Sequence, residues 1–174
     1  GRFDEAESMY VKTLDGRKRI FGAEHPAVLA SMNNLASLYN KQGRYGEAEL
    51  LHASTLKIKV RILGEEHPST LNSFNNLANA LREQGRFAEA EPLFLKTIEI
   101  SKRGRGEEHP GTLNSMSNLV LLYEKQGDVN SARPLIRTLQ AIQLRDAEKS
   151  SASARDKNTC AWTLLTCEPE DLRD

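Results

Sequence analysis

Asparagine is the residue type whose spacing in this sequence points most directly to a chemistry. Asn72, Asn76 and Asn79 lie four and three residues apart, which places them on one face of a helix. A side-chain amide carries two N–H donors and a C=O acceptor. A row of amides can therefore pair with the backbone of an extended peptide, whatever the peptide's side chains are. The alternative is structural: the amides of Asn34, Asn76 and Asn118 would cap or bridge neighbouring helices.

Histidine is the second residue type that invites a chemical interpretation. His25, His67 and His109 recur at a constant interval, each followed by proline. If the repeats stack, these side chains lie roughly 10 Å or more apart, the scale of a helix diameter, whereas zinc ligands lie ~2 Å from one shared ion. We therefore expect turn residues and no metal site. His52 stands where the neighbouring repeats have aromatic residues, and we expect it to be a packing residue.

The charge balance argues against a nucleic-acid-binding protein, and the motifs do not indicate an enzyme. Lys plus Arg and Asp plus Glu number 24 each among 174 residues, so the basic surplus of a nucleic-acid binder is missing. No nucleophile with its base, phosphate-binding loop or inward carboxylate pair is recognisable, so we expect no catalysis and no cofactor. No apolar run approaches the ~20 residues of a membrane span. Cys160 and Cys167 lie too far apart on a helix for a disulfide, which predicts free thiols and a cytoplasmic protein.

A regular sequence repeat must position the asparagines. Gly1, Gly43, Gly85 and Gly127 are spaced by one constant period, and 21 of the 42 positions in residues 43–84 are identical in residues 85–126. Self-similarity at such a period is typical of stacked helical repeats.

Each unit predicts two helices. The first begins at a proline, which is well placed at the first helical position because its missing N–H is not needed there. In the central unit this helix carries an apolar stripe at helical spacing and ends at Gly85, which supplies a left-handed residue. The second helix covers "AEAEPLFLKTIEISKR". The apolar stripe of the first helix consists of Leu71, Phe74, Leu77, Ala78 and Leu81.

The motifs of these helices resemble a known family. Leu-Ala, then Tyr or Leu, then Gly-Arg-aromatic and Glu-Ala-Glu resemble the tetratricopeptide repeat, whose usual period is about 34 residues. The 42-residue period, with "NNLA.LY..QGRY.EAE" and "LG.EHP", resembles the longer repeats of kinesin light chains and their bacterial and fungal relatives. The resemblance covers residues 1 to about 145. It implies an all-α, right-handed superhelical solenoid of antiparallel helix pairs.

The resemblance also implies which residues face a ligand. In such arrays the first helix of each pair lines a concave groove, and its second, fifth, sixth and ninth positions face that groove. Here these positions hold eight asparagines, so we predict a groove that binds an extended peptide of a protein partner. Neighbouring basic and acidic residues give the groove a mixed charge. The predicted groove residues are Asn33, Asn34, Asn72, Asn75, Asn76, Asn79, Asn114 and Asn118, with Lys41, Arg82 and Lys125 one turn further along.

The two ends of the sequence match the repeat only in part. Residues 1–20 match the second helix of a unit, and full repeats are expected to start near residues 26, 68 and 110. We predict that the array ends near residue 145, that residues 146–157 form a linker or a frayed helix end, and that residues 158–174 form a partial, divergent helix. Trp162 in that helix would stack on a ligand or, as we favour, cover the end of the array.

Other functions stay open at this point. The C-terminal residues resemble the repeat arrays of some bacterial serine/threonine protein kinases. The chain would then be the regulatory arm of an enzyme whose catalytic domain lies outside it. The apolar ends of the array could also mediate self-association. Arg19, Arg61 and Arg103, near the ends of second helices, complement the helix dipole or form a phosphate-binding stripe.

Overall fold

The computed structural model describes residues 1–166, and it describes the side chains of residue 1 and of residues 3–149. This part of the chain contains seven α-helices and no strand. One helix is followed by three helix pairs, as the repeat predicts. Among the described residues, no helix is both long enough and apolar enough to span a membrane. The helices are α1 (Arg2–Phe21), α2 (Pro26–Lys41), α3 (Tyr45–Leu63), α4 (Pro68–Glu83), α5 (Phe87–Arg105), α6 (Pro110–Gln126) and α7 (Val129–Thr166).

Each first helix, α2, α4 or α6, begins at the same histidine–proline pair. His25, His67 and His109 have extended backbones with ψ of 139°, 135° and 134°. The Nδ1 atom of each accepts a hydrogen bond from the backbone N–H two residues on, at 3.2, 3.1 and 3.0 Å. The imidazole thus satisfies one of the N–H groups that the first helical turn leaves unpaired. These histidines are helix caps, which confirms their prediction as turn residues.

A glycine with positive φ separates the two helices of each pair. Gly43, Gly85 and Gly127 have φ of 75°, 76° and 79°, in the left-handed region that favours glycine. After Gly85, the backbone N–H of Arg86 donates to the carbonyl of Leu81 at 3.0 Å. The predicted helix boundaries at these glycines are confirmed.

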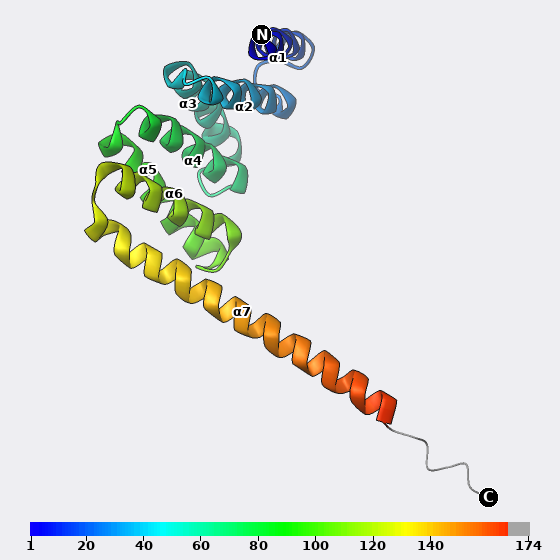
Figure 1. Cartoon of the computed structure of the whole chain (residues 1–174). Helices are drawn as coiled ribbons and strands as arrows, with labels where there is room; N and C mark the ends of the chain where they lie inside the picture. The colour runs from blue at the N-terminus through cyan, green and yellow to red at the C-terminus, as the bar shows by residue number, and fades with distance from the viewer. Residues whose placement is uncertain (167–174) are drawn as a thin grey trace, which may run out of the picture.

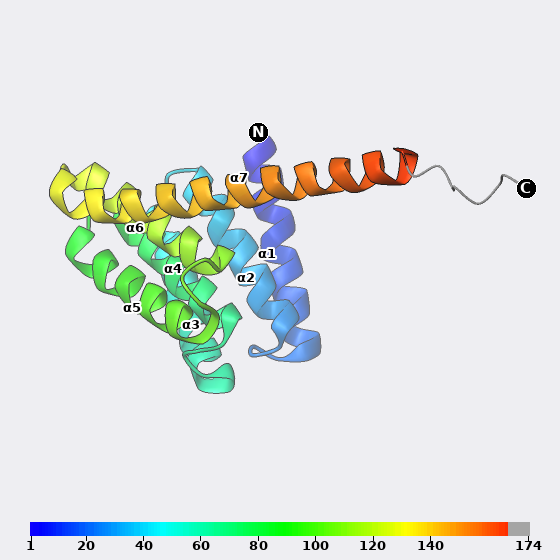
Figure 2. The ribbon, with the colours of Figure 1, turned by 90° about the horizontal axis from the view of Figure 1, so that it is seen from below.

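The helices stack in chain order. Each helix packs against the next one, and α4 also contacts α6. Figure 1 shows the pairs following one another from the N-terminus, and Figure 2 shows the same stack turned by 90°. Ala78 and Ala90 are fully buried where α4 and α5 meet, and Phe94 and Leu119 fill the adjacent core. Small residues at the crossing let the helix backbones approach closely, and large ones complete the packing.

The C-terminal helix differs from the prediction. The sequence predicts a linker or frayed end at residues 146–157 and a separate partial helix after it, but α7 runs without a break from Val129 to Thr166. It extends well beyond the stacked helices (Figures 1 and 2). The stretch "DAEKSSASARDK" holds neither glycine nor proline, so nothing in it stops a helix. The predictions for the side chains of Cys160, Trp162 and Cys167 lie outside the described residues.

Candidate functional site on the first helices

The predicted groove residues lie at three depths on α2, α4 and α6. Depth matters because only an accessible amide can meet a ligand. Asn34, Lys41, Asn72, Asn114 and Lys125 are exposed, Asn33, Asn76, Asn79, Arg82 and Asn118 are partly buried, and Asn75 is buried.

Four of the accessible amides are unpaired. The side chains of Asn34, Asn72, Asn76 and Asn114 form no hydrogen bond with any other residue that the structure describes. Asn34 and Asn76 hold the same position on α2 and α4, and Asn72 and Asn114 hold the same position on α4 and α6. Unpaired amides therefore recur from one repeat to the next.

Asn75 needs a correction, because it does not lie on the open face. Its side chain is 4% exposed, and Nδ2 donates a hydrogen bond of 2.8 Å to the Ser115 hydroxyl. The bond ties α4 to α6. At ~3.6 residues per turn, Asn75 points about 100° away from Asn76, on the side of α4 that contacts α6. Asn75 belongs to the packing between repeats.

Two partly buried asparagines present an unpaired acceptor. The Oδ1 atoms of Asn33 and Asn79 are buried and have no hydrogen-bond donor among the described residues. A buried polar atom without a partner costs ~1–3 kcal/mol. An incoming N–H group that reached either oxygen would remove this cost.

The basic residues of the predicted groove are largely neutralised. Arg82 is 11% exposed and donates to the Asn118 backbone carbonyl at 3.3 Å and to the Glu83 carboxylate at 3.0 Å. Lys125 pairs with the same carboxylate. Burial opposes ionisation of Glu83, but the hydrogen bonds from Lys125 and Arg82 outweigh it and lower the pKa of Glu83. Lys41 is exposed.

Two of the three repeated arginines of the second helices form ion pairs. Arg61 forms an ion pair with Glu24, and Arg103 forms one with Glu66. Each pair joins the end of a second helix to the turn before the preceding first helix. For Arg61 and Arg103 these contacts favour the structural interpretation over a phosphate-binding stripe.

A hollow of about 230 Å³ brings two predicted groove residues together. Asn34 and Lys41 of α2 line it with Ser37 and Leu38, and Tyr10 of α1 closes its other side. This hollow supports the predicted accessibility of Asn34 and Lys41. It offers an amide, an ammonium group and an aromatic ring within one small volume.

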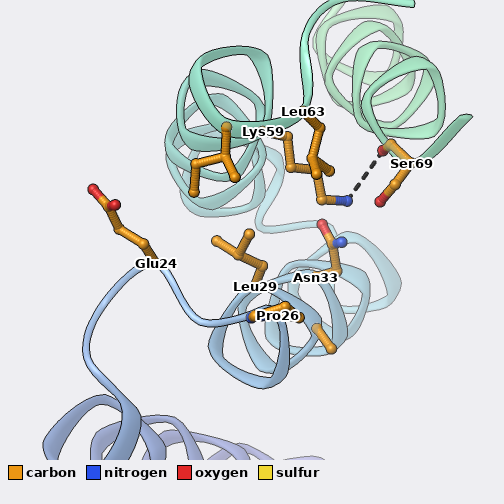
Figure 3. A pocket seen from close by; sticks show the side chains of 9 residues that line it. Glu24, Pro26, Leu29, Asn33, Lys59, Leu63 and Ser69 are labelled. Atoms are coloured by element: carbon orange, nitrogen blue, oxygen red, sulfur yellow. Dashed lines mark hydrogen bonds between the residues drawn. The ribbon is translucent and has the colours of Figure 1, made fainter. Parts of the chain in front are cut away.

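A second hollow contains a residue that the sequence analysis missed. Lys59 of α3 and Asn33 of α2 line a cavity of about 290 Å³ between α2, α3 and the start of α4, and Figure 3 shows the Asn33 amide pointing toward the Lys59 ammonium group. One signal was available: Arg17 holds the position equivalent to Lys59 in the preceding repeat. Two cations at one repeat position, both predicted to lie on a second helix, could have drawn attention to this position.

Metal-ligating residue types do not cluster in the part of the chain that the structure describes. This part contains no group of three or more His, Cys, Asp or Glu side chains that could hold a metal ion. His52 is buried at 1% exposure, as expected of a packing residue. The asparagine amides and the neighbouring side chains on α2, α4 and α6 can offer a ligand hydrogen bonds and apolar contact.

Comparison with known proteins identifies the architecture. The family model described as tetratricopeptide repeat matches residues 1–59, 51–103 and 69–145. A search of curated proteins found no match. Two crystal structures of a putative kinesin light chain with nearly identical TPR-like repeats from Podosopora anserina are similar. One is 30% identical over 85% of this chain and 70% of that chain with a TM-score of 0.76, and the other is 31% identical over 84% and 69% with a TM-score of 0.73.

BtubC (BKLC) from P. vanneervenii shares the fold. It is 23% identical, with a TM-score of 0.72 over 100% of this chain and 79% of that chain. None of these relatives bears on the predicted resemblance of the C-terminal residues to kinase repeat arrays, which stays a prediction. The 42-residue helix pairs, their capped first helices and the match over most of the sequence agree with one another. The chain therefore belongs to the tetratricopeptide repeat family, and its solved relatives carry kinesin light chain-like repeats.

Proposed function

We propose that this protein is an interaction scaffold that binds an extended peptide along the asparagine-bearing face of α2, α4 and α6. One observation carries the proposal: the amides of Asn34, Asn72, Asn76 and Asn114 recur along the stack with no partner among the described residues. Solenoids of this kind use a long concave surface for binding. Asparagine lowers helix stability, so a run of unpaired asparagines on a helix is better explained by a ligand than by the fold.

The spacing of the amides suits a peptide backbone. Asn72 and Asn76 lie one turn apart on α4, about 6 Å along the helix axis. An extended chain rises ~3.3 Å per residue, so groups two residues apart are separated by about 6.6 Å. Two amides on α4 can therefore meet backbone groups that point to the same side of a peptide. Such contacts are independent of the peptide's side chains.

The charges near the proposed groove do not select an acidic ligand. Glu83 accepts hydrogen bonds from both Arg82 and Lys125, so two of the three predicted cations are already paired. We therefore expect binding to change little between low and physiological salt, because neutral hydrogen bonds are not screened as charges are.

We also infer a binding rather than a catalytic role, and a cytoplasmic location on the basis of the two predicted free cysteines.

The proposal is tested with a selected ligand and nuclear magnetic resonance. A phage-displayed library of random peptides is selected on the wild-type protein, and one enriched peptide is titrated into ¹⁵N-labelled protein. We expect the side-chain NH₂ signals of Asn34, Asn72, Asn76 and Asn114 to shift with one common saturation curve. The buried NH₂ group of Asn75 serves as the internal control. A titration that shifts none of the four accessible amides would contradict the proposed site.

A further inference from the structure

The cavity between α2, α3 and the start of α4 combines apolar walls with a polar floor. Pro26, Leu29 and Ala30 line it from α2, and Ile62 and Leu63 line it from the end of α3. Ile62 and Leu63 are exposed large apolar side chains. A ligand that entered the cavity would cover apolar surface that water now contacts, which is favourable.

The floor of the cavity contains a buried cation without a counter-ion. Lys59 is only 7% exposed and donates hydrogen bonds to the Ser69 carbonyl at 3.1 Å and the Ser73 hydroxyl at 2.9 Å. It forms no ion pair with any described residue. Burial of an ammonium group without an opposite charge is costly, and burial lowers the pKa of Lys59. Its third N–H group has no assigned acceptor.

The acidic residue at the cavity does not supply the missing charge. Glu24 lines the rim, but its carboxylate forms an ion pair with Arg61 and points away from Lys59 (Figure 3). The Lys59 ammonium group therefore stays available to an anion that enters from outside.

Asn33 places an acceptor beside this donor. Its Oδ1 atom is buried and has no donor among the described residues, and its amide points toward Lys59 in Figure 3. A matching ligand needs an anionic acceptor for Lys59 and, a short distance away, an N–H donor for Asn33. A carboxylate and an acylated amine on one carbon atom provide both groups.

We propose that this cavity binds an N-acylated aliphatic amino acid. Its carboxylate accepts a hydrogen bond from Lys59, its amide N–H donates to Asn33 Oδ1, and its side chain packs against Leu29, Ile62 and Leu63. The volume of about 290 Å³ lies at the lower end of the ~300–1,000 Å³ of small-molecule pockets, as one residue requires. The C-terminal residue of a peptide carries the same carboxylate and amide N–H. Only the choice of a peptide terminus as the source of the ligand rests on the proposed function.

The neighbouring repeats show that packing alone does not demand this lysine. One repeat earlier, Arg17 donates to the Ala27 carbonyl at 3.2 Å and the Ser31 hydroxyl at 2.7 Å. One repeat later the position is Ser101, which accepts a hydrogen bond from Thr112. The array therefore folds with arginine, lysine or serine at this position. Lysine is the one that lines the cavity.

N-acetyl-leucine is the probe that tests the cavity, and N-acetyl-leucine amide, which lacks the carboxylate, is its control. Each is titrated into the ¹⁵N-labelled wild-type chain, and the Asn33 side-chain NH₂ signal is followed. We expect saturable shifts with N-acetyl-leucine and an affinity at least tenfold lower with the amide. Equal affinities, or no saturable shift with N-acetyl-leucine, would overturn the proposal.

Three variants locate the binding site. Lys59→Met removes the charge and keeps an apolar stem, and it should weaken N-acetyl-leucine at least tenfold. Ala30→Leu fills the opening while Lys59 stays in place, so it should block binding even if Lys59→Met fails to fold. Arg17→Met is the matched control, because Arg17 does not line the cavity, and its affinity should equal that of the wild type. Wild-type affinity in Ala30→Leu would overturn the proposal.

Two further measurements separate this site from the proposed groove. Asn72→Ala/Asn76→Ala should bind N-acetyl-leucine with the affinity of the wild type. The proposal for the cavity therefore stands even if the proposed peptide-binding face is wrong. The N-acetylated tetrapeptide acetyl-Ala-Ala-Ala-Leu keeps its C-terminal carboxylate. It should bind more tightly than N-acetyl-leucine if the natural ligand is a peptide C-terminus. Equal affinity would assign the cavity to a free N-acyl amino acid. Loss of N-acetyl-leucine binding in the asparagine double variant would overturn a separate cavity site.

Discussion

A change of pH from 7 to 5 should destabilise this protein through one histidine. His52 is 1% exposed, and its Nδ1 atom is buried without a hydrogen-bond partner. Burial and then the positive charge of Lys59 lower the pKa of His52 from 6.5 to about 4. The imidazole is therefore neutral in the folded protein at pH 5, although it is mostly protonated in the unfolded chain.

The sign and size of the effect follow from proton linkage. Because the folded-state pKa of His52 lies below its unfolded-state value, the unfolded chain binds more protons between about pH 4 and pH 6.5. Stability therefore falls as pH falls through this window. With pKa values of about 4 and 6.5, the change from pH 7 to pH 5 costs roughly 2 kcal/mol. At a urea m-value of ~2 kcal/mol/M the unfolding midpoint moves down by about 1 M.

His52→Phe isolates this contribution. The next repeat has Phe94 at the same position, and Phe94 is fully buried, so the fold accommodates the ring. Urea unfolding of the wild type and of His52→Phe is measured at pH 7 and pH 5 by circular dichroism. Because the other titrating groups are unchanged, the variant should escape the loss of stability that linkage assigns to His52 and lose correspondingly less than the wild type between these pH values. Equal losses in both proteins would refute the assignment of the effect to His52.

Two substitutions test the packing and the turns of the array. Leu119 is 1% exposed in the core between α5, α6 and α7, so Leu119→Ala should cost ~2–5 kcal/mol, whereas Leu144→Ala on the exposed face of α7 should stay within ~0.5 kcal/mol. Similar losses in urea unfolding would contradict the assigned core. Gly85 has φ of 76°, so Gly85→Val should cost more than ~1 kcal/mol, and a valine variant as stable as the wild type in thermal unfolding would show that this turn tolerates a Cβ.

The periodic features of the fold were predictable from the sequence. The proline after each histidine fixes where a first helix begins, and the glycine at each 42-residue step fixes where it ends, because the backbone geometry at both points depends on the residue type. Because the sequence repeats, helix boundaries that are correct for one helix pair apply to all three pairs. His52 was also predictable as a packing residue, because its repeat position holds an aromatic residue elsewhere.

The site was predictable only in part. Assignment by repeat position placed Asn75 and Asn76 together in the groove, yet a turn of about 100° between them sends Asn75 toward Ser115. The cavity at Lys59 escaped prediction because it is built from α2, α3 and α4, so no single helix pattern reveals it. The length of α7 was not predicted from the repeat, because beyond the stack the helix depends on the helix propensity of its own residues and not on packing against a neighbouring repeat.

The most direct test of the central claim is the affinity of Asn72→Ala/Asn76→Ala for the peptide selected on the wild-type protein. Each lost hydrogen bond is worth ~0.5–1.5 kcal/mol, so fluorescence titration should show a Kd about tenfold higher or more. The variant should be at least as stable as the wild type, because alanine is the better helix former. Asn75→Ala is the matched control, with lower stability and an unchanged Kd. An unchanged Kd in the double variant, together with a loss of stability, would make Asn72 and Asn76 part of the scaffold and contradict the proposed peptide-binding face.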